Sequence, residues 1–177
     1  DNEYSIEWEK GVRIHMNREF LYELLETASV SGFEEEIQRK VIKYAKGFAD
    51  EIYTDEIADV VSIVNPDAEI KVMLSAHMDE IGLMVSHITE KGMLVSKAGG
   101  IYPGTYLGQK VRIMHEGNVV YGAVRNHGSL NKKELEITDI IIDIGAVSRE
   151  DAMAHVACGD PVSFDTDYRE LLNDRLC

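Results

Sequence analysis

The chain has 177 residues, 45% of them hydrophobic, which is enough for one or two small domains with a buried core. Its formal net charge of −14 argues against nucleic acids and anionic membranes as partners, because both attract basic surfaces. No apolar run approaches the ~20 residues that span a bilayer, and Cys158 and Cys177 do not suggest a disulfide framework. These features predict an acidic cytoplasmic protein.

The first part of the chain has helical periodicity after a polar start. Residues 1–17 are polar and aperiodic, so we expect a leader or a loosely ordered arm there. Apolar residues then recur at helical spacing through residues 18–28, and again from Glu34 to Phe48. Ser31 stands three residues before Glu34, a spacing typical of a capping box at the start of the second helix.

Three strands are expected after these helices. In the third, Val72, Met73 and Leu74 are consecutive, which is typical of a central strand buried on both faces. The expected ranges are 52–53, 60–64 and 70–74. Two helices followed by strands are the usual start of an α/β domain.

A second, β-rich module is predicted from residue 83 to residue 159. Its short strand-like runs are separated by glycine-containing turns such as Glu116-Gly117-Asn118. A short helix capped by Ser148 is expected at residues 148–155. Residues 160–164 are expected to return as a strand of the first domain. The expected strands of the module are 83–88, 93–96, 110–115, 119–125 and 136–142.

The sequence His77-Met78-Asp79-Glu80 directly follows the predicted central strand. Ligand sites in open α/β sheets lie beyond the carboxyl ends of strands. On an extended backbone, His77 and Asp79 point to the same side, which suits a metal-binding imidazole and a carboxylate that orients it. Glu80 is left with two interpretations: it touches this site, or it packs and caps at the boundary of the β-rich module.

Several motifs in the chain resemble one family of peptidases. They include HMDEIG at residues 77–82, IDIGA at residues 142–146, and Ser31-Gly32-Phe33-Glu34 upstream. Together they resemble the dinuclear metallo-aminopeptidases, which include glutamyl and deblocking aminopeptidases and the tetrahedral aminopeptidase assemblies. The resemblance extends from about Arg18 to Phe164 and concerns the N-terminal portion of such proteins.

The resemblance implies a fold and a division into domains. The fold class is α/β, with part of a zinc-peptidase-like catalytic domain interrupted by a β-rich, PDZ-like dimerisation domain. Residues 18–82 and 160–177 would form the incomplete catalytic domain, and residues 83–159 the dimerisation domain. Peptides would be the substrates, and dimers would be building blocks of a larger homo-oligomer.

The resemblance also implies the chemistry of the site. Two divalent ions, Zn²⁺ or Co²⁺, would serve hydrolysis of the N-terminal peptide bond. His77 would bind one ion, and Asp79 would act in catalysis by orienting the imidazole. The family's other metal ligands and its general base would follow Cys177, so the 177-residue chain is expected to be inactive by itself.

An alternative function remains open at this point. The chain could be a non-catalytic assembly or binding module derived from such a peptidase, with His77 as a relic. The other histidines do not help to decide, because none has a partner at a metal-binding spacing. They are His15, His87, His115, His127 and His155.

Overall fold

The computed structural model describes residues 5–7, 13–15, 17–127, 134–173 and 175–177. The chain divides into two compact units, which are described separately below. One unit joins residues 1–27 to residues 167–177, and the other contains residues 28–166. No described helix is long and apolar enough to cross a membrane.

The first unit contains one helix and two short pairs of strands. Helix α1 begins after Asn17, whose side chain accepts a hydrogen bond from the Phe20 amide at 3.0 Å. Tyr22 on α1 stacks on Tyr168, with 4.0 Å between ring centroids. Within the expected leader or arm at residues 1–17, β1 and β2 pair antiparallel with each other. The bounds are Ser5–Glu7 (β1), Arg13–His15 (β2), Arg18–Leu25 (α1), Glu170–Leu171 (β11) and Arg175–Leu176 (β12).

The second unit begins with a helix and a β-hairpin, as predicted. Helix α2 (Glu35–Ala45) packs against β4 and buries Ile37 and Ala45, which lie on one face of the helix. Strands β3 (Glu51–Thr54) and β4 (Val60–Ile63) pair antiparallel. These elements confirm the second helix and the first two strands, although α2 is shorter at both ends than the predicted helix.

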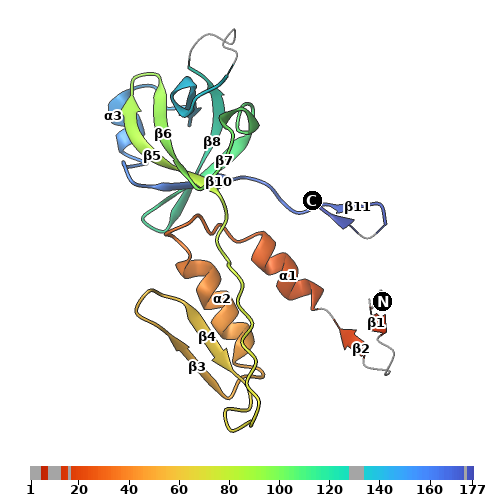
Figure 1. Ribbon diagram of the computed structural model, residues 1–177. Helices are drawn as coiled ribbons and strands as arrows, with labels where there is room; N and C mark the ends of the chain where they lie inside the picture. The colour runs from red at the N-terminus through yellow and green to blue at the C-terminus, as the bar shows by residue number, and fades with distance from the viewer. Residues whose placement is uncertain (1–4, 8–12, 16, 128–133, 174) are drawn as a thin grey trace. The chain divides into compact units, whose positions relative to one another are not determined.

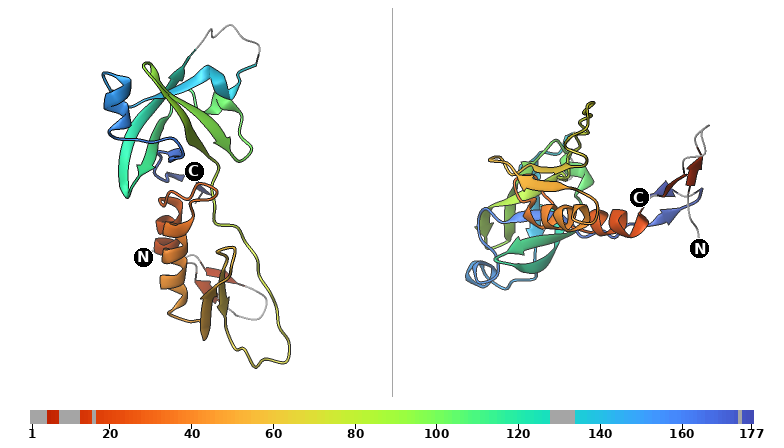
Figure 2. Two further views of the ribbon diagram at one scale, coloured as in Figure 1. Left: turned by 90° about the vertical axis from the view of Figure 1, so that its left-hand side faces the viewer. Right: turned by 90° about the horizontal axis from the view of Figure 1, so that it is seen from below.

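The predicted central strand at residues 70–74 is not formed. The chain between β4 and β5 contains no described helix or strand, and it is drawn as a plain coil in Figures 1 and 2. Leu74 is 92% exposed and Met73 is 89% exposed. A strand that is apolar on both faces needs neighbouring strands and covering layers, and the described residues provide none here. The apolar run therefore lies exposed to solvent.

The rest of the second unit is a closed barrel of six antiparallel strands, in the order β10-β5-β6-β9-β8-β7 (Figures 1 and 2). The strands are Gly82–Thr89 (β5), Gly92–Ala98 (β6), Lys110–His115 (β7), Asn118–Asn126 (β8), Ile140–Asp143 (β9) and Pro161–Phe164 (β10). Short helices occupy Pro103–Thr105 (η1), Ile137–Asp139 (η2) and Arg149–Met153 (α3). Closure pairs the strand edges with each other and encloses one apolar core.

A β-bulge keeps strand β5 in register with this core. Leu83 and Val85 alternate into the barrel, but the pairing shifts between Val85 and His87. The extra residue, Ser86, leaves His87 exposed and brings Ile88 back inside. Simple alternation would have placed His87 in the core, so the bulge is what makes this strand fit.

The expected end of the β-rich module at residue 159 is too early. Strand β10 pairs with both β5 and β7, and Val162 is completely buried in the barrel core. Without β10 the barrel would have two open edges, so this strand belongs to the barrel and does not return to the first domain. The Ser148 cap of α3 is confirmed, since its hydroxyl accepts from the Asp151 amide at 3.1 Å.

Candidate metal-ligand site

His77 and Asp79 contact each other directly in the segment that leads into the barrel. The imidazole Nδ1 lies 2.9 Å from the Asp79 carboxylate Oδ1 and 3.1 Å from the Asp79 main-chain oxygen. A carboxylate can only accept, so Nδ1–H is the donor and the lone pair of the neutral ring is on Nε2. The His77 side chain is 85% exposed, which leaves Nε2 open to a ligand. The two side chains are therefore in contact, and their roles at a metal ion stay a prediction.

Ser31 completes the pair from the other side. Its hydroxyl donates a hydrogen bond to Asp79 Oδ2, so both carboxylate oxygens of Asp79 have partners. The hydrogen bond from Ser31 lowers the pKa of Asp79, and the hydrogen bond from His77 lowers this pKa further. Asp79 is therefore held as an anion that can orient the imidazole and increase its basicity.

The predicted capping box between Ser31 and Glu34 is wrong. Helix α2 starts at Glu35 after an N-cap residue, Glu34, that makes no side-chain cap. The Glu34 carboxylate instead accepts from the amide of Gly32 at 2.7 Å. The spacing between Ser31 and Glu34 suggested a local cap. The sequence did not show that the Ser31 hydroxyl instead donates a hydrogen bond to Asp79, 48 residues later.

Main-chain pairing holds the two parts of this site together. Val30 and Glu80 form a parallel bridge, in which the Glu80 amide donates to the Ser29 carbonyl at 2.8 Å. The Ser31 amide donates in turn to the Glu80 carbonyl at 3.3 Å. Residues 29–31 are thus fixed against residues 79–80, and this brings the Ser31 hydroxyl within reach of Asp79.

The residues fit a divalent ion as one ligand of a larger set. A free, exposed imidazole Nε2 with an anionic carboxylate on Nδ1 is the usual arrangement of a metal-binding histidine. A catalytic zinc site usually has about three protein ligands. Within the part of the chain that the structure describes, no group of three His, Cys, Asp or Glu side chains could hold a metal ion.

The remaining described histidines lie apart from this site. His115 Nδ1 contacts Asp160 Oδ2 at 2.9 Å and joins β7 to the turn before β10 inside the barrel unit. A cavity of about 260 Å³ also belongs to the barrel, and none of residues 77–80 lines it. Its walls come from the β5–β6 turn, β8, β9 and the start of α3. Neither feature supplies a second ligand to His77.

Replacing Ser31 by alanine should raise the pKa of Asp79, because the first cause of its lowered pKa is removed. A lowered carboxyl pKa stabilises the fold above the ordinary carboxyl pKa, and this contribution is lost as the pH falls through the folded-state pKa. The variant should therefore lose stability at neutral pH and approach the wild type in acid. Carboxyl-carbon NMR titration of Asp79 measures the shift, with Ser62→Ala, an exposed serine of β4, as control. An unchanged Asp79 midpoint in Ser31→Ala would contradict the assignment.

One protein-family model matches most of the chain. Residues 60–177 match the model of the M42 glutamyl aminopeptidase family. The chain belongs to the M42 family. The matched region includes His77, Asp79 and the whole barrel.

Individual M42 relatives support the same conclusion. A lysyl aminopeptidase of Pyrococcus furiosus is 37% identical over 143 residues, which is 76% of this chain and 41% of the relative. A TET aminopeptidase structure from a marine sediment archaeon of the Thaumarchaeota has a TM-score of 0.82 and 30% identity. That match covers 89% of this chain and 47% of the archaeal chain.

A third M42 comparison concerns assembly. The TET1 peptidase of Pyrococcus horikoshii is described as assembling into a tetrahedron or a large octahedral shell. It has a TM-score of 0.76 and 31% identity, and the match covers 88% of this chain and 48% of that one. The chain thus spans about half the length of the M42 relatives that it matches.

Proposed function

We propose that this chain is the N-terminal portion of a metal-dependent aminopeptidase and that it contributes His77 as a metal ligand. The observation that carries the proposal is the His77–Asp79–Ser31 arrangement, which leaves Nε2 exposed and the carboxylate anionic. This arrangement orients the imidazole so that Nε2 can bind a cation. The ring contributes little to packing, because it is mostly exposed.

The reaction proposed is hydrolysis of the N-terminal peptide bond with two divalent ions, Zn²⁺ or Co²⁺, in the complete enzyme. Bound ions would supply polarisation of the scissile carbonyl and a water of lowered pKa. His77 would hold an ion through its exposed Nε2, and Asp79 keeps the Nδ1 proton in place. Both roles belong to residues of this chain.

The exposed apolar run supports the view that the catalytic domain is incomplete here. Ile70, Val72, Met73 and Leu74 are each at least 80% exposed, which is unusual for consecutive apolar residues of a soluble protein. We infer that polypeptide corresponding to the second half of the M42 relatives covers this run as neighbouring strands. The 177-residue chain alone is then expected to lack activity.

The barrel is proposed to be the PDZ-like dimerisation domain, with the peptidase domain outside it. Assembly into a larger homo-oligomer is inferred from the M42 relatives that form closed shells. Peptides are the proposed substrates, neither nucleic acid nor membrane is a proposed partner, and a cytoplasmic location stays a prediction. The alternative function, a non-catalytic assembly module, predicts the same oligomer without activity.

Joining this chain to the second half of the Pyrococcus furiosus lysyl aminopeptidase tests the proposal. The joined protein should release free amino acids from the N-terminus of an unblocked peptide, and a chelator should stop the reaction. Light scattering on the same preparation should report a particle larger than a monomer. A large, well-folded particle without peptidase activity at any added Zn²⁺ or Co²⁺ concentration would favour the assembly module.

A further inference from the structure

Glu80 binds the turn at residues 29–31 with its side chain as well as its main chain. Its Oε1 accepts a hydrogen bond from the Ser29 amide at 3.1 Å, next to the main-chain bonds that Glu80 makes to Ser29 and Ser31. Four residues therefore meet at one point: two from the turn before α2 and two from the end of the HMDE sequence. Glu80 takes part in three of the four hydrogen bonds that join them.

Partial burial of the Glu80 carboxylate is energetically unfavourable for its charged form. Burial is the first cause of the raised pKa of Glu80, and the Ser29 amide and the charge of Arg112 oppose it. A half-buried carboxylate is retained where its hydrogen bonds fix a structure that a neutral apolar side chain would not specify. A purely packing role at this boundary would be served better by leucine or methionine.

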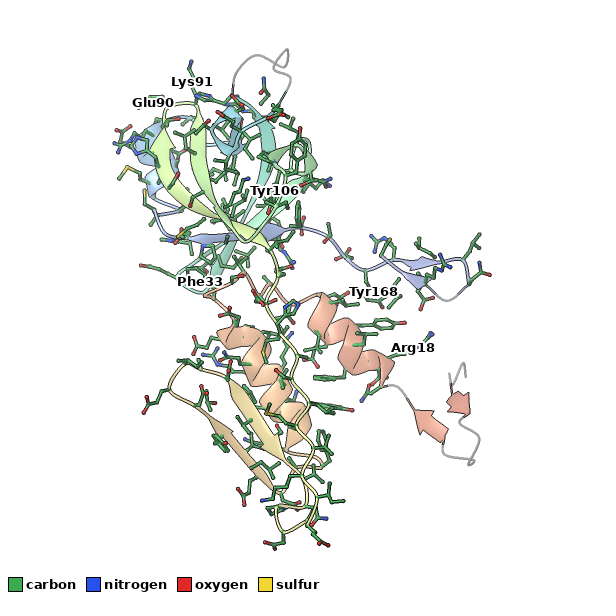
Figure 3. All side chains as sticks on the ribbon, in the orientation of Figure 1. Arg18, Phe33, Glu90, Lys91, Tyr106 and Tyr168 are labelled. Carbon is green, nitrogen blue, oxygen red and sulfur yellow. The ribbon has the colours of Figure 1, made fainter. Side chains whose placement is uncertain are left out.

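A buried tyrosine of the barrel is affected by the charge of the same carboxylate. Tyr106, labelled in Figure 3, is completely buried, and its hydroxyl makes no hydrogen bond to any described residue. Burial, followed by the charge of Glu80, raises the pKa of Tyr106 to about 12. The ring is fixed by stacking on Phe164, with 4.5 Å between ring centroids.

We propose that Glu80 is a positioning residue for His77. Its carboxylate binds the Ser29 amide and, together with the main-chain bonds of Glu80 to Ser29 and Ser31, holds this turn against residues 79–80, so that the Ser31 hydroxyl binds Asp79 and Asp79 holds the imidazole. The Glu80 carboxylate binds the Ser29 amide whereas the His77 ring contacts Asp79, so the proposed effect of Glu80 on the imidazole passes through Ser31 and Asp79. The inference rests on the proposed role of His77 as a metal ligand and extends it to the barrel boundary.

The tautomer of His77 is the measurement that tests this proposal. Nitrogen-15 NMR of the neutral ring distinguishes Nδ1–H, the form that Asp79 requires, from Nε2–H. In Glu80→Met, which keeps the side-chain length but has no acceptor, the Nδ1–H to Nε2–H ratio should fall about fivefold, as for the loss of one typical hydrogen bond. Glu80→Gln keeps an acceptor for the Ser29 amide and should restore the wild-type ratio. Glu69→Met, at an exposed glutamate of the same loop, is the matched control.

A merely structural role would lower stability without changing the tautomer. The proposal is overturned if Glu80→Met keeps the barrel amide spectrum and the wild-type ratio, or if Glu80→Gln behaves like Glu80→Met. Glu80→Ala provides a second loss of the acceptor with the same expected ratio, in case the methionine variant does not fold.

A separate measurement shows whether the proposed ligand role itself holds. Added Co²⁺ should broaden the His77 ring signals of the wild-type chain and leave those of His87 sharp. Broadening at His77 together with an unchanged tautomer in the Glu80 variants would refute the positioning role of Glu80 and leave the ligand role of His77 standing. Equal broadening at His77 and His87 would refute the ligand role and with it this extension.

Discussion

Replacing His77 by alanine should abolish stoichiometric binding of one divalent ion in the protein that joins this chain to the second half of an M42 relative. The exposed Nε2 of His77 is the one ligand that these 177 residues are proposed to offer, and a catalytic zinc has about three protein ligands in total. Loss of one of these three ligands leaves a position that only water can occupy. Peptidase activity should therefore fall to background. Isothermal calorimetry with Zn²⁺ and the rate of amino-acid release measure the two effects.

Asp79→Asn should have a smaller effect of the same kind. The amide oxygen can still accept the Nδ1 proton, but the negative charge that strengthens the imidazole as a donor is lost, along with the acceptor for the Ser31 hydroxyl. Metal affinity or rate should drop ~10–100-fold, as is usual for a residue that orients a ligand. His87→Ala, at an exposed histidine of β5, is the control and should bind metal normally. Tight zinc binding that survives His77→Ala would place the site elsewhere.

The strands of the β-rich module were predictable because the sequence signals that define them are local. Alternating apolar residues and glycine turns identify strands by themselves, and the turn at Glu116 and Gly117 has the positive φ values, 47° and 81°, that such hairpins require. The β5 bulge and the pairing of β10 with β7 could not be read this way. Both depend on which strands meet at closure, and sequence spacing does not contain that information.

The candidate site was predictable in part for the same reason. His77 and Asp79 are two residues apart, a spacing that places both side chains on one side of an extended backbone. The two side chains make contact although the structure has no strand at residues 70–79. Ser31 and Glu80 act through contacts between segments about 50 residues apart, and Ser31 was instead given a local capping role. The run at residues 70–74 shows the opposite error. Its apolar composition predicts a buried strand, but burial would require neighbouring polypeptide that these 177 residues do not include.

Gly82→Ala should destabilise the second unit much more than Gly100→Ala. Gly82 is the first residue of β5, where the HMDEIG sequence enters the barrel. A Cβ added there would lie 2.6 Å from Val30 Cγ2 and 2.7 Å from the main-chain oxygen of Val162. Both neighbours are buried, and the Val162 carbonyl belongs to β10, so it cannot move without disturbing the barrel closure. Overpacking of this kind costs about 1–3 kcal/mol.

Gly100 offers a matched control because an added Cβ there meets no atom within 4 Å. Its alanine variant should stay within about 0.5 kcal/mol of the wild type, as most surface substitutions do. Urea unfolding should show a lower midpoint for Gly82→Ala with an unchanged slope. Faster amide exchange at Ser31 and Glu80 should accompany it, because displacement of Val30 pulls on the Val30–Glu80 bridge. Equal midpoints for the two variants would mean that β5 and β10 adjust around the methyl group, and that the glycine of HMDEIG is not required for close packing at the entry to the barrel.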